Sequence, residues 1–133
     1  MTYRIINPEE LGRPSGWNHG LLAPVGGRLL FVAGQTARDP SGEVTISGFV
    51  QQFERALEGA LAVVREAGGG PEHIGRLNIY VTDLQAYLAS RKELGVVYRR
   101  LMEKHYPAMV LLEVKGLADE GALVEIEATA VVP

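Results

Sequence analysis

The most regular pattern in the chain is a helical stripe of apolar residues between Ser47 and Gly68. Apolar side chains recur there at three- and four-residue spacing, which is typical of an amphipathic helix with one buried face. The stripe consists of Phe49, Phe53, Leu57, Ala60, Leu61 and Val64. Gln52 and the charged residues of this segment fall on other faces. Glycines 68–70 followed by Pro71 predict the helix end, because glycine accepts the left-handed cap and proline cannot continue a helix.

A second helix is predicted from Asp83, as the N-cap residue, to about Lys104. Its buried stripe consists of Tyr87, Leu94, Val97, Tyr98 and Leu101. Pro107 follows closely, and the residue before a proline is biased away from helical conformation. These signals bound one helix of about 20 residues.

Residues 76–82 alternate between apolar and polar side chains and predict a strand. Residues 21–34 predict a β-hairpin, since Gly26 and Gly27 separate two apolar runs and supply the positive φ of a tight turn. Two more strands are predicted within 106–114 and at 124–128, with a turn-rich segment, 115–121, between them.

Side-chain alternation divides the last two predicted strands into two faces. We expect one set to face the helices: Val110, Leu112, Val114, Val124, Ile126 and Ala128. The other set would lie on the opposite face: Met109, Leu111, Glu113, Glu125, Glu127 and Thr129. A face that is half apolar and half acidic predicts a partner subunit that covers it.

The order of elements predicts an α+β fold in a single domain, 1–133. We expect a two-layer sandwich in which a mixed β-sheet carries two helices on one face. A chain of 133 residues is long enough to bury one core. Apolar residues make up 47% of this chain, which favours an oligomer for a subunit this small.

Composition excludes several classes of function. The net charge is −3 and the basic residues are scattered, so we expect no nucleic-acid partner. No apolar run approaches about 18 residues and no signal-peptide layout is visible, so we expect no membrane partner and a cytoplasmic protein. The chain has no cysteine, which excludes thiol nucleophiles and disulfides. The histidines are widely spaced and the 68–70 glycines follow a helix, so we expect no metal and no cofactor.

Five segments, in order along nearly the whole chain, resemble the RidA/YjgF family. They are residues 30–35, Pro40 to Val44, Gln52 to Leu57, Val81 to Leu84, and Pro107 to Val114 with Glu125 to Ala128 beyond it. The resemblance implies a homotrimer of chorismate-mutase-like subunits whose clefts lie between subunits and hold small carboxylate-bearing metabolites. It also implies hydrolysis of amino-acid-derived imines and enamines to keto acids and ammonia.

The chain departs from that family where deaminases place an arginine after Pro-Ala. This position is Met109, whose thioether accepts hydrogen bonds weakly and donates none, so it cannot hold a carboxylate as a guanidinium does. Trp17 stands where deaminases usually have tyrosine, and Ala33 replaces a small polar residue. These changes predict a divergent member with a more apolar pocket and a larger or less acidic ligand.

The resemblance implies that Glu125 activates water as the catalytic residue. We expect the substrate to be bound by Trp17, His19, Ala33, Gly34, Met109 and Leu111. The alternative for Glu125 is a solvated or paired carboxylate on a strand, and the alternative for His19 is a surface or hydrogen-bonding role. Four arginines are candidates to replace the missing guanidinium: Arg13, Arg28, Arg38 and Arg91.

Two functions follow from these residues. The first is a divergent RidA-like hydrolase, an imine or enamine deaminase with an altered substrate range. The second, favoured by Met109, is a non-catalytic trimeric protein that binds a small molecule or has a regulatory role. A purely structural trimer with closed clefts is a third possibility.

Overall fold

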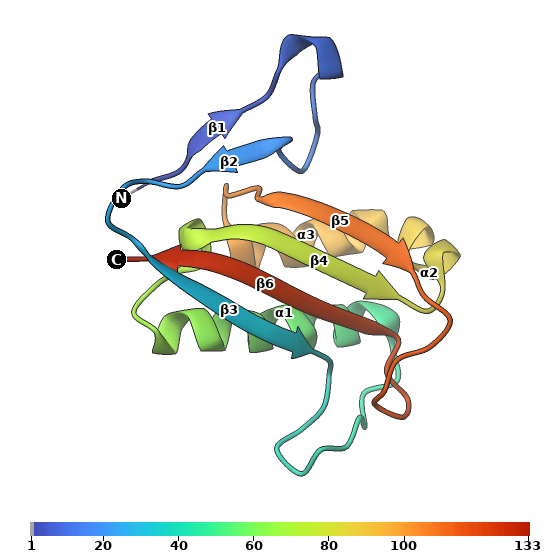
Figure 1. Ribbon diagram of the computed structural model, residues 1–133. Coiled ribbons are helices and arrows are strands. Elements are labelled where there is room, and N and C mark those ends of the chain that lie inside the picture. Colours follow the sequence, from blue (N-terminus) through green and yellow to red (C-terminus); the bar gives the residue numbers. More distant parts are fainter. Residues whose placement is uncertain (1) are drawn as a thin grey trace.

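A four-stranded mixed sheet carries the helices on one face in the computed structural model, which describes residues 2–133 (Figure 1). Its strands run in the order β3-β6-β4-β5. Their bounds are Arg28–Gln35 for β3, Val124–Val132 for β6, Ile74–Val81 for β4 and Ala108–Glu113 for β5. β6 is antiparallel to both of its neighbours, whereas β4 and β5 are parallel. The predicted two-layer α+β fold is therefore confirmed.

The first predicted helix is α1, Phe49–Glu66. It ends as its glycines indicated: Gly68 has φ 92°. The N–H of Gly69 donates to the Val64 carbonyl and the N–H of Gly68 to that of Arg65, both at 2.9 Å. This pair of bonds is the Schellman motif, which satisfies two of the last carbonyls of a helix.

The second predicted helix is broken, and the prediction of one continuous helix was wrong. α2 spans Leu84–Ala89 and α3 spans Arg91–Met102. Ser90 lies between them with φ −104° and ψ 8°, and its N–H donates to the carbonyl of Tyr87, three residues back. The start was predicted correctly, because the Asp83 carboxylate accepts the N–H groups of Gln85 and Ala86 at 3.0 and 3.2 Å.

The predicted hairpin within 21–34 does not form. β2, Gly20–Leu22, pairs instead with β1, Arg4–Ile6, in a separate antiparallel sheet. The turn itself is present, with Gly26 at φ 90°, but Pro24 has no N–H to donate to a ladder between β2 and β3. Short 3₁₀ turns, Glu9–Leu11 and Pro71–His73, complete the elements.

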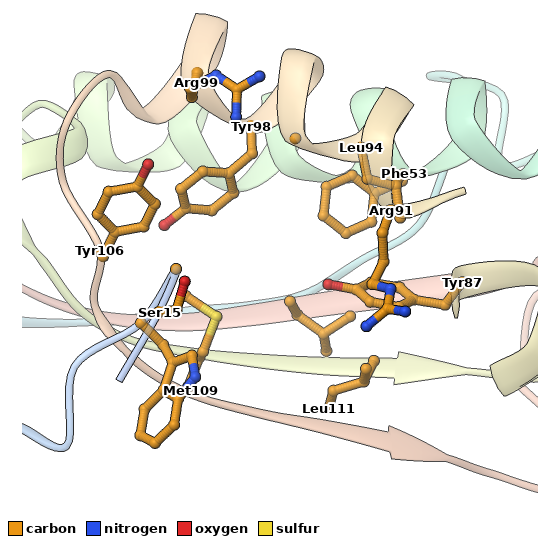
Figure 2. A pocket seen from close by; sticks show the side chains of 14 residues that line it. Ser15, Phe53, Tyr87, Arg91, Leu94, Tyr98, Arg99, Tyr106, Met109 and Leu111 are labelled. Carbon is orange, nitrogen blue, oxygen red and sulfur yellow. The ribbon is translucent and has the colours of Figure 1, made fainter. Parts of the chain in front are cut away.

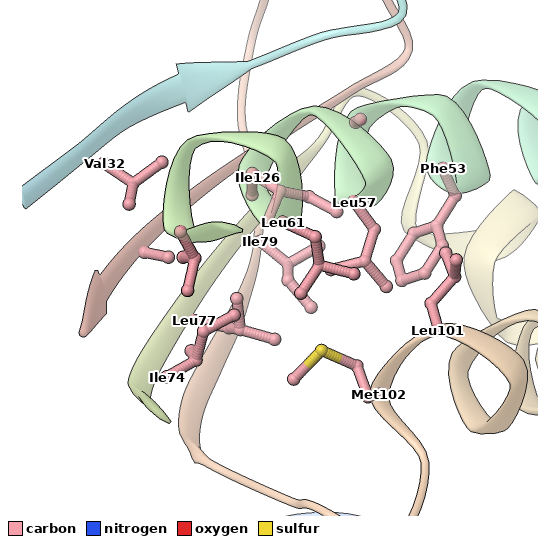
Figure 3. Close-up of a cluster of buried hydrophobic side chains, with 14 of the residues drawn as sticks. Val32, Phe53, Leu57, Leu61, Ile74, Leu77, Ile79, Leu101, Met102 and Ile126 are labelled. Atoms are coloured by element: carbon pink, nitrogen blue, oxygen red, sulfur yellow. The ribbon is translucent and has the colours of Figure 1, made fainter. Parts of the chain in front are cut away.

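The core lies between α1, α3 and the sheet (Figure 3). Leu57, Leu61, Ile74 and Ile126 are among its fully buried side chains. α1 presents the predicted stripe to β3 and β6, because its apolar residues repeat with the helical period. Gln52, which the apolar stripe leaves on another face of the helix, is buried as well, with 1% of its surface exposed.

The buried Gln52 amide joins three segments of the chain. Its Nε2 donates to the carbonyls of Ile46 and Gly121, at 2.7 and 2.9 Å. Its Oε1 accepts the N–H of Leu123 at 2.8 Å. The side chain thus makes the hydrogen bonds that a buried amide needs, and it fixes the segment before α1 to the entry of β6.

The two faces of β6 are as predicted, but those of β5 are reversed. Val124, Ile126 and Ala128 are buried on the helix side. Met109 and Leu111 pair in register with the buried Leu77 and Ile79 of β4, and pack against the same core. Val110 and Leu112 are 39% and 45% exposed on the opposite face. Residues 108–112 are apolar without interruption, so the sequence has no polar residue to mark the outer side of this strand.

Candidate functional site

A cavity of about 610 Å³ lies between α3 and β5, within the range of small-molecule sites (Figure 2). Three of the predicted binding residues, Trp17, Met109 and Leu111, line it. The rest of its lining comes from Ser15, Gly16, Phe53, Ile79, Tyr87, Arg91, Leu94, Gly95, Tyr98, Arg99 and Tyr106.

The loop that carries Trp17 is held at the start of β5 by Asn18. The N–H of Asn18 donates to the Pro107 carbonyl at 3.2 Å, and its Nδ2 donates to the Tyr106 carbonyl at 2.6 Å. These bonds hold the loop against the start of β5, where Trp17 lines the cavity together with Met109. The sequence alone does not point to Asn18, because a loop asparagine carries no pattern that distinguishes it.

His19 does not line this cavity and instead supports its wall. The His19 ring packs edge-on against Trp17, with ring centroids 4.6 Å apart. Its Nε2 lies 3.1 Å from the carbonyl of Gly12. The arrangement matches the hydrogen-bonding alternative for this residue, with the imidazole orienting Trp17.

Tyrosines form the far wall of the cavity. Tyr98 and Tyr106 stack with centroids 5.4 Å apart, and the Tyr98 hydroxyl donates to the His105 carbonyl at 3.0 Å. Burial raises the pKa of Tyr98 well above its ordinary value, and neighbouring tyrosines add to this effect. Burial also raises the pKa of Tyr87, an effect that the charge of Arg91 partly offsets. These phenols therefore stay neutral at physiological pH.

Glu125, Ala33 and Gly34 belong to a second group, on the helix-free face of the sheet. Glu125 pairs in register with Tyr80, and its carboxylate lies over Gly34, where a β-carbon would collide with it. Ala33 and Gly34 lie in the bulge of β3 opposite β6. Glu125 and Gly34 are thus neighbours. The expectation that Glu125 shares a face with Met109 was wrong, because Met109 of β5 faces the helices and Glu125 does not.

Comparison with known proteins gives one consistent family. The profile of the family described as Endoribonuclease L-PSP matches residues 14–132. A RutC family protein of Pyrococcus abyssi is 31% identical over 132 residues, covering 98% of each chain. The crystal structure of the Rid family protein YyfB from Yersinia pestis superposes with a TM-score of 0.84 at 32% identity, covering 99% of this chain and 100% of that one.

The chain belongs to the RidA/YjgF family. A mouse protein named 2-iminobutanoate/2-iminopropanoate deaminase is a more distant relative, 26% identical over 105 residues, with 78% of this chain and 74% of that protein covered.

In this RidA/YjgF subunit only one of the four candidate arginines reaches the cavity. Arg91 lines it. Arg28 donates to the carbonyl of Pro133 at 2.8 and 3.1 Å, and Arg38 lies 3.9 Å from the Asp119 carboxylate. Arg99 also lines the cavity and was missed, although its position eight residues after Arg91 puts both on one helical face.

Within residues 2–133, no helix is long and apolar enough to cross a membrane. The same residues contain no cluster of three metal-ligating side chains. His73 and His105, the other two histidines, serve local structure. His73 Nδ1 accepts the N–H of Gly70 at 2.8 Å, and His105 Nε2 lies 2.6 Å from the Ile74 carbonyl.

Glu127 is a hydrogen-bonded carboxylate on the helix-free face. The Tyr80 hydroxyl donates to its Oε1 at 2.5 Å, and Asn78 Nδ2 donates to the same oxygen at 2.9 Å. The bond from Tyr80, followed by that from Asn78, holds the pKa of Glu127 below its ordinary value. The charged form therefore stabilises the fold above the ordinary pKa of about 4.5, and this contribution is lost as the pH falls below it.

Tyr80→Phe should therefore make the acid limb of the stability profile shallower. The variant lacks the main donor that lowers the Glu127 pKa, so it has less stability to lose on acidification. Urea unfolding midpoints at pH 7 and pH 3 measure this difference. Tyr106→Phe removes a hydroxyl from the stacked pair and serves as the control with a native-like pH dependence. Identical acid limbs in native protein and Tyr80→Phe would contradict the role given to Tyr80.

Proposed function

We propose that this protein binds a small metabolite in clefts between the copies of a homotrimer and hydrolyses an imine or enamine there. The observation that carries the proposal is Glu125. It occupies the family position for water activation and lies beside Gly34 on a sheet face that no helix covers. The name of the mouse relative, an imine deaminase, supports the same chemistry. Ribonuclease activity is not part of the proposal, because a net charge of −3 with scattered basic residues offers no surface for a phosphate backbone.

The helix-free face has the properties of a surface that copies of the chain cover. It exposes Phe31 at 75% and Leu29 at 59% from β3, with Val110 and Leu112 from β5. These side chains lie on the two edge strands of one uncovered sheet face, with the polar residues of β6 and β4 between them. Large apolar side chains exposed on such a face mark an interaction surface.

Assembly is also what allows the two groups of site residues to meet. Within one subunit the sheet separates Glu125 from the cavity beside Met109. In the proposed trimer, Glu125 and Gly34 of one copy close the open side of another copy's cavity. Each cleft then contains a carboxylate from one chain and the Trp17, Met109 and Leu111 wall from the next.

The proposed reaction is an addition followed by an elimination. The Glu125 carboxylate accepts a proton from water while the water oxygen bonds to the imine carbon. The same carboxyl group gives that proton to the nitrogen, which completes the addition as a carbinolamine. The new hydroxyl group then loses its proton to the nitrogen through the Glu125 carboxylate as the carbon–nitrogen bond breaks, which releases ammonia and a carbonyl compound. One glutamate thus acts as general base and then as general acid.

Met109 favours a second candidate function, a trimer that binds a metabolite without converting it. A thioether cannot form the paired hydrogen bonds with a carboxylate that an arginine forms. A ligand of the ordinary deaminase type would therefore be held less firmly at this position.

Ammonia release from freshly generated imines tests the two candidates. With the hydrolase, Glu125→Ala should lower the rate by about a hundredfold, the usual contribution of a general acid–base group. Glu120→Ala, which removes an exposed carboxylate from the loop before β6, should keep the native rate. Equal rates in native protein and Glu125→Ala would exclude the catalytic role.

Met109→Arg separates the binder from the hydrolase. If ammonia release above background occurs only after this substitution, the native protein is a binder. If the native protein is active and Met109→Arg shifts its preference toward small 2-imino acids, the protein is a hydrolase with altered range.

A further inference from the structure

We propose that the ligand of the cavity beside Met109 is an anion with a planar apolar body, and that Arg91 on α3 holds its anionic group. The inference deepens the proposed function and rests on it, because it concerns the same cavity. It assigns the guanidinium to the helix wall, opposite the β5 position where deaminases of the family carry theirs.

The charge of the cavity is unbalanced. Arg91 and Arg99 both line it, while no aspartate or glutamate does so among the described residues. Neither arginine has a carboxylate within 4 Å in the described part of the chain, in contrast to Arg100, which pairs with Glu54 at 2.8 Å. In the proposed trimer, Glu125 of another copy adds one carboxylate to a cavity lined by two arginines, so an excess of positive charge remains. This excess favours an anionic ligand, with which a guanidinium forms charge-assisted hydrogen bonds.

The two arginines occupy different ends of the cavity. Arg91 is the first residue of α3 and Arg99 follows two turns later, about 12 Å along the helix axis. Figure 2 shows Arg91 extending from the helix toward the sheet, beside Tyr87 and on the side of Leu111, while Arg99 stays at the level of the helix near Tyr98. The two side chains therefore extend to different parts of the cavity, and Arg91 is the one that points toward the wall formed by β5.

The remaining walls fit a flat apolar body. Trp17, Phe53 and three tyrosines surround the space between Arg91 and Met109, and the thioether of Met109 adds a soft apolar contact. An aromatic ring can stack or pack edge-on against these side chains. A two- or three-carbon acid would leave most of the 610 Å³ cavity unfilled.

Gly95 keeps this space open. It lies in the interior of α3, where alanine is intrinsically more favourable, and it lines the cavity between Arg91 and Arg99. A β-carbon at this position would lie 3.1 Å from Nη1 of Arg99, so the guanidinium would have to shift by a few tenths of an ångström and the methyl group would take up part of the space beside it. The Arg99 side chain is exposed, so the fold itself can accommodate the methyl group.

The emission of Trp17, the single tryptophan of the chain, reports binding directly. Three compounds separate the contribution of the charge from that of the ring: phenylacetate has both, phenylacetamide lacks the charge, and acetate lacks the ring. In native protein we expect phenylacetate to bind at least tenfold more tightly than either of the others. Arg91→Gln should bring the acid-to-amide ratio close to one. Lys92→Gln removes the same charge from the adjacent exposed residue, outside the cavity, and should keep the native ratio.

Gly95→Ala provides a second test, because it should raise the melting temperature and lower the affinity for phenylacetate. The melting temperature should rise by about 2 °C, because alanine favours the helix. Phenylacetate binding should weaken several-fold, because the cavity becomes smaller. A variant that gains stability while losing affinity cannot be explained by misfolding.

The outcomes distinguish this inference from the proposed function. Equal affinity for phenylacetate and phenylacetamide in native protein would overturn the anion assignment and leave the ligand site in place. Loss of the acid preference in Arg99→Gln but not in Arg91→Gln would overturn the assignment to Arg91. No response of Trp17 to any of the three compounds would contradict the cavity as a ligand site, and with it the proposed function.

Discussion

Gln52→Met should lower the free energy of unfolding by about 3 kcal/mol. Methionine matches glutamine in length and approximate volume but removes three partly buried hydrogen bonds: those to the carbonyls of Ile46 and Gly121 and the one from the N–H of Leu123. A buried polar group that loses its partner costs about 1–3 kcal/mol, and relaxation of the nearby loops reduces the sum. Urea unfolding measures the loss, which corresponds to a melting temperature on the order of 10 °C lower.

Gln51→Met is the matched control, since Gln51 is adjacent on α1 but exposed. Its effect should stay within about 0.5 kcal/mol, as is usual for surface substitutions. If both variants have native stability, the bonds of Gln52 contribute nothing beyond those that water provides in the unfolded chain.

The burial of Gln52 marks one limit of sequence patterns. Periodicity assigns faces by polarity, and it found the apolar stripe of α1 and the buried side of β6 correctly. A glutamine on the buried face breaks the pattern because its partners, at residues 46 and 121–123, come from segments without regular structure. Only the folded chain brings those backbone groups together.

The faces of β5 mark a second limit. A strand that is apolar on both sides gives the same pattern in either orientation, and the parallel register with β4 decides which side faces the helices. The break at Ser90 is of the same kind, because serine is an ordinary helix residue and nothing local requires the helix to end there.

The candidate site, too, could be predicted from the sequence only in part. The sequence, through the family resemblance, named Trp17, Met109 and Leu111, which line one cavity, and Glu125 with Gly34, which are neighbours. It did not reveal that the sheet separates the two groups, nor that Arg91, Arg99 and Tyr98 of α3, with two further tyrosines, complete the cavity. Helical spacing places residues 91, 95 and 99 on one face, but only the packing of α3 on β5 makes that face a wall.

Phe31→Asp should abolish the proposed trimer. Phe31 is 75% exposed on β3, opposite Thr129 in the ladder, and lies on the face that also exposes Leu29, Val110 and Leu112. In an assembled interface an aspartate here would be a desolvated charge without an arranged partner. We expect association to weaken at least a hundredfold, or about 2.8 kcal/mol. Light scattering after size exclusion at micromolar concentration should give three copies of the 14.4 kDa chain for native protein and one for the variant.

Val96→Asp provides the control, because Val96 is an apolar residue 59% exposed on α3, in the layer on the other side of the sheet. This variant should remain a trimer. Circular dichroism must show that Phe31→Asp is folded, since a surface charge leaves the core of one subunit intact. A native mass of one chain would remove the assembled clefts, and with them the only route by which Glu125 meets the cavity beside Met109. The catalytic proposal would then fall, whereas Trp17 titrations on the monomer would still decide whether the cavity binds an anion through Arg91.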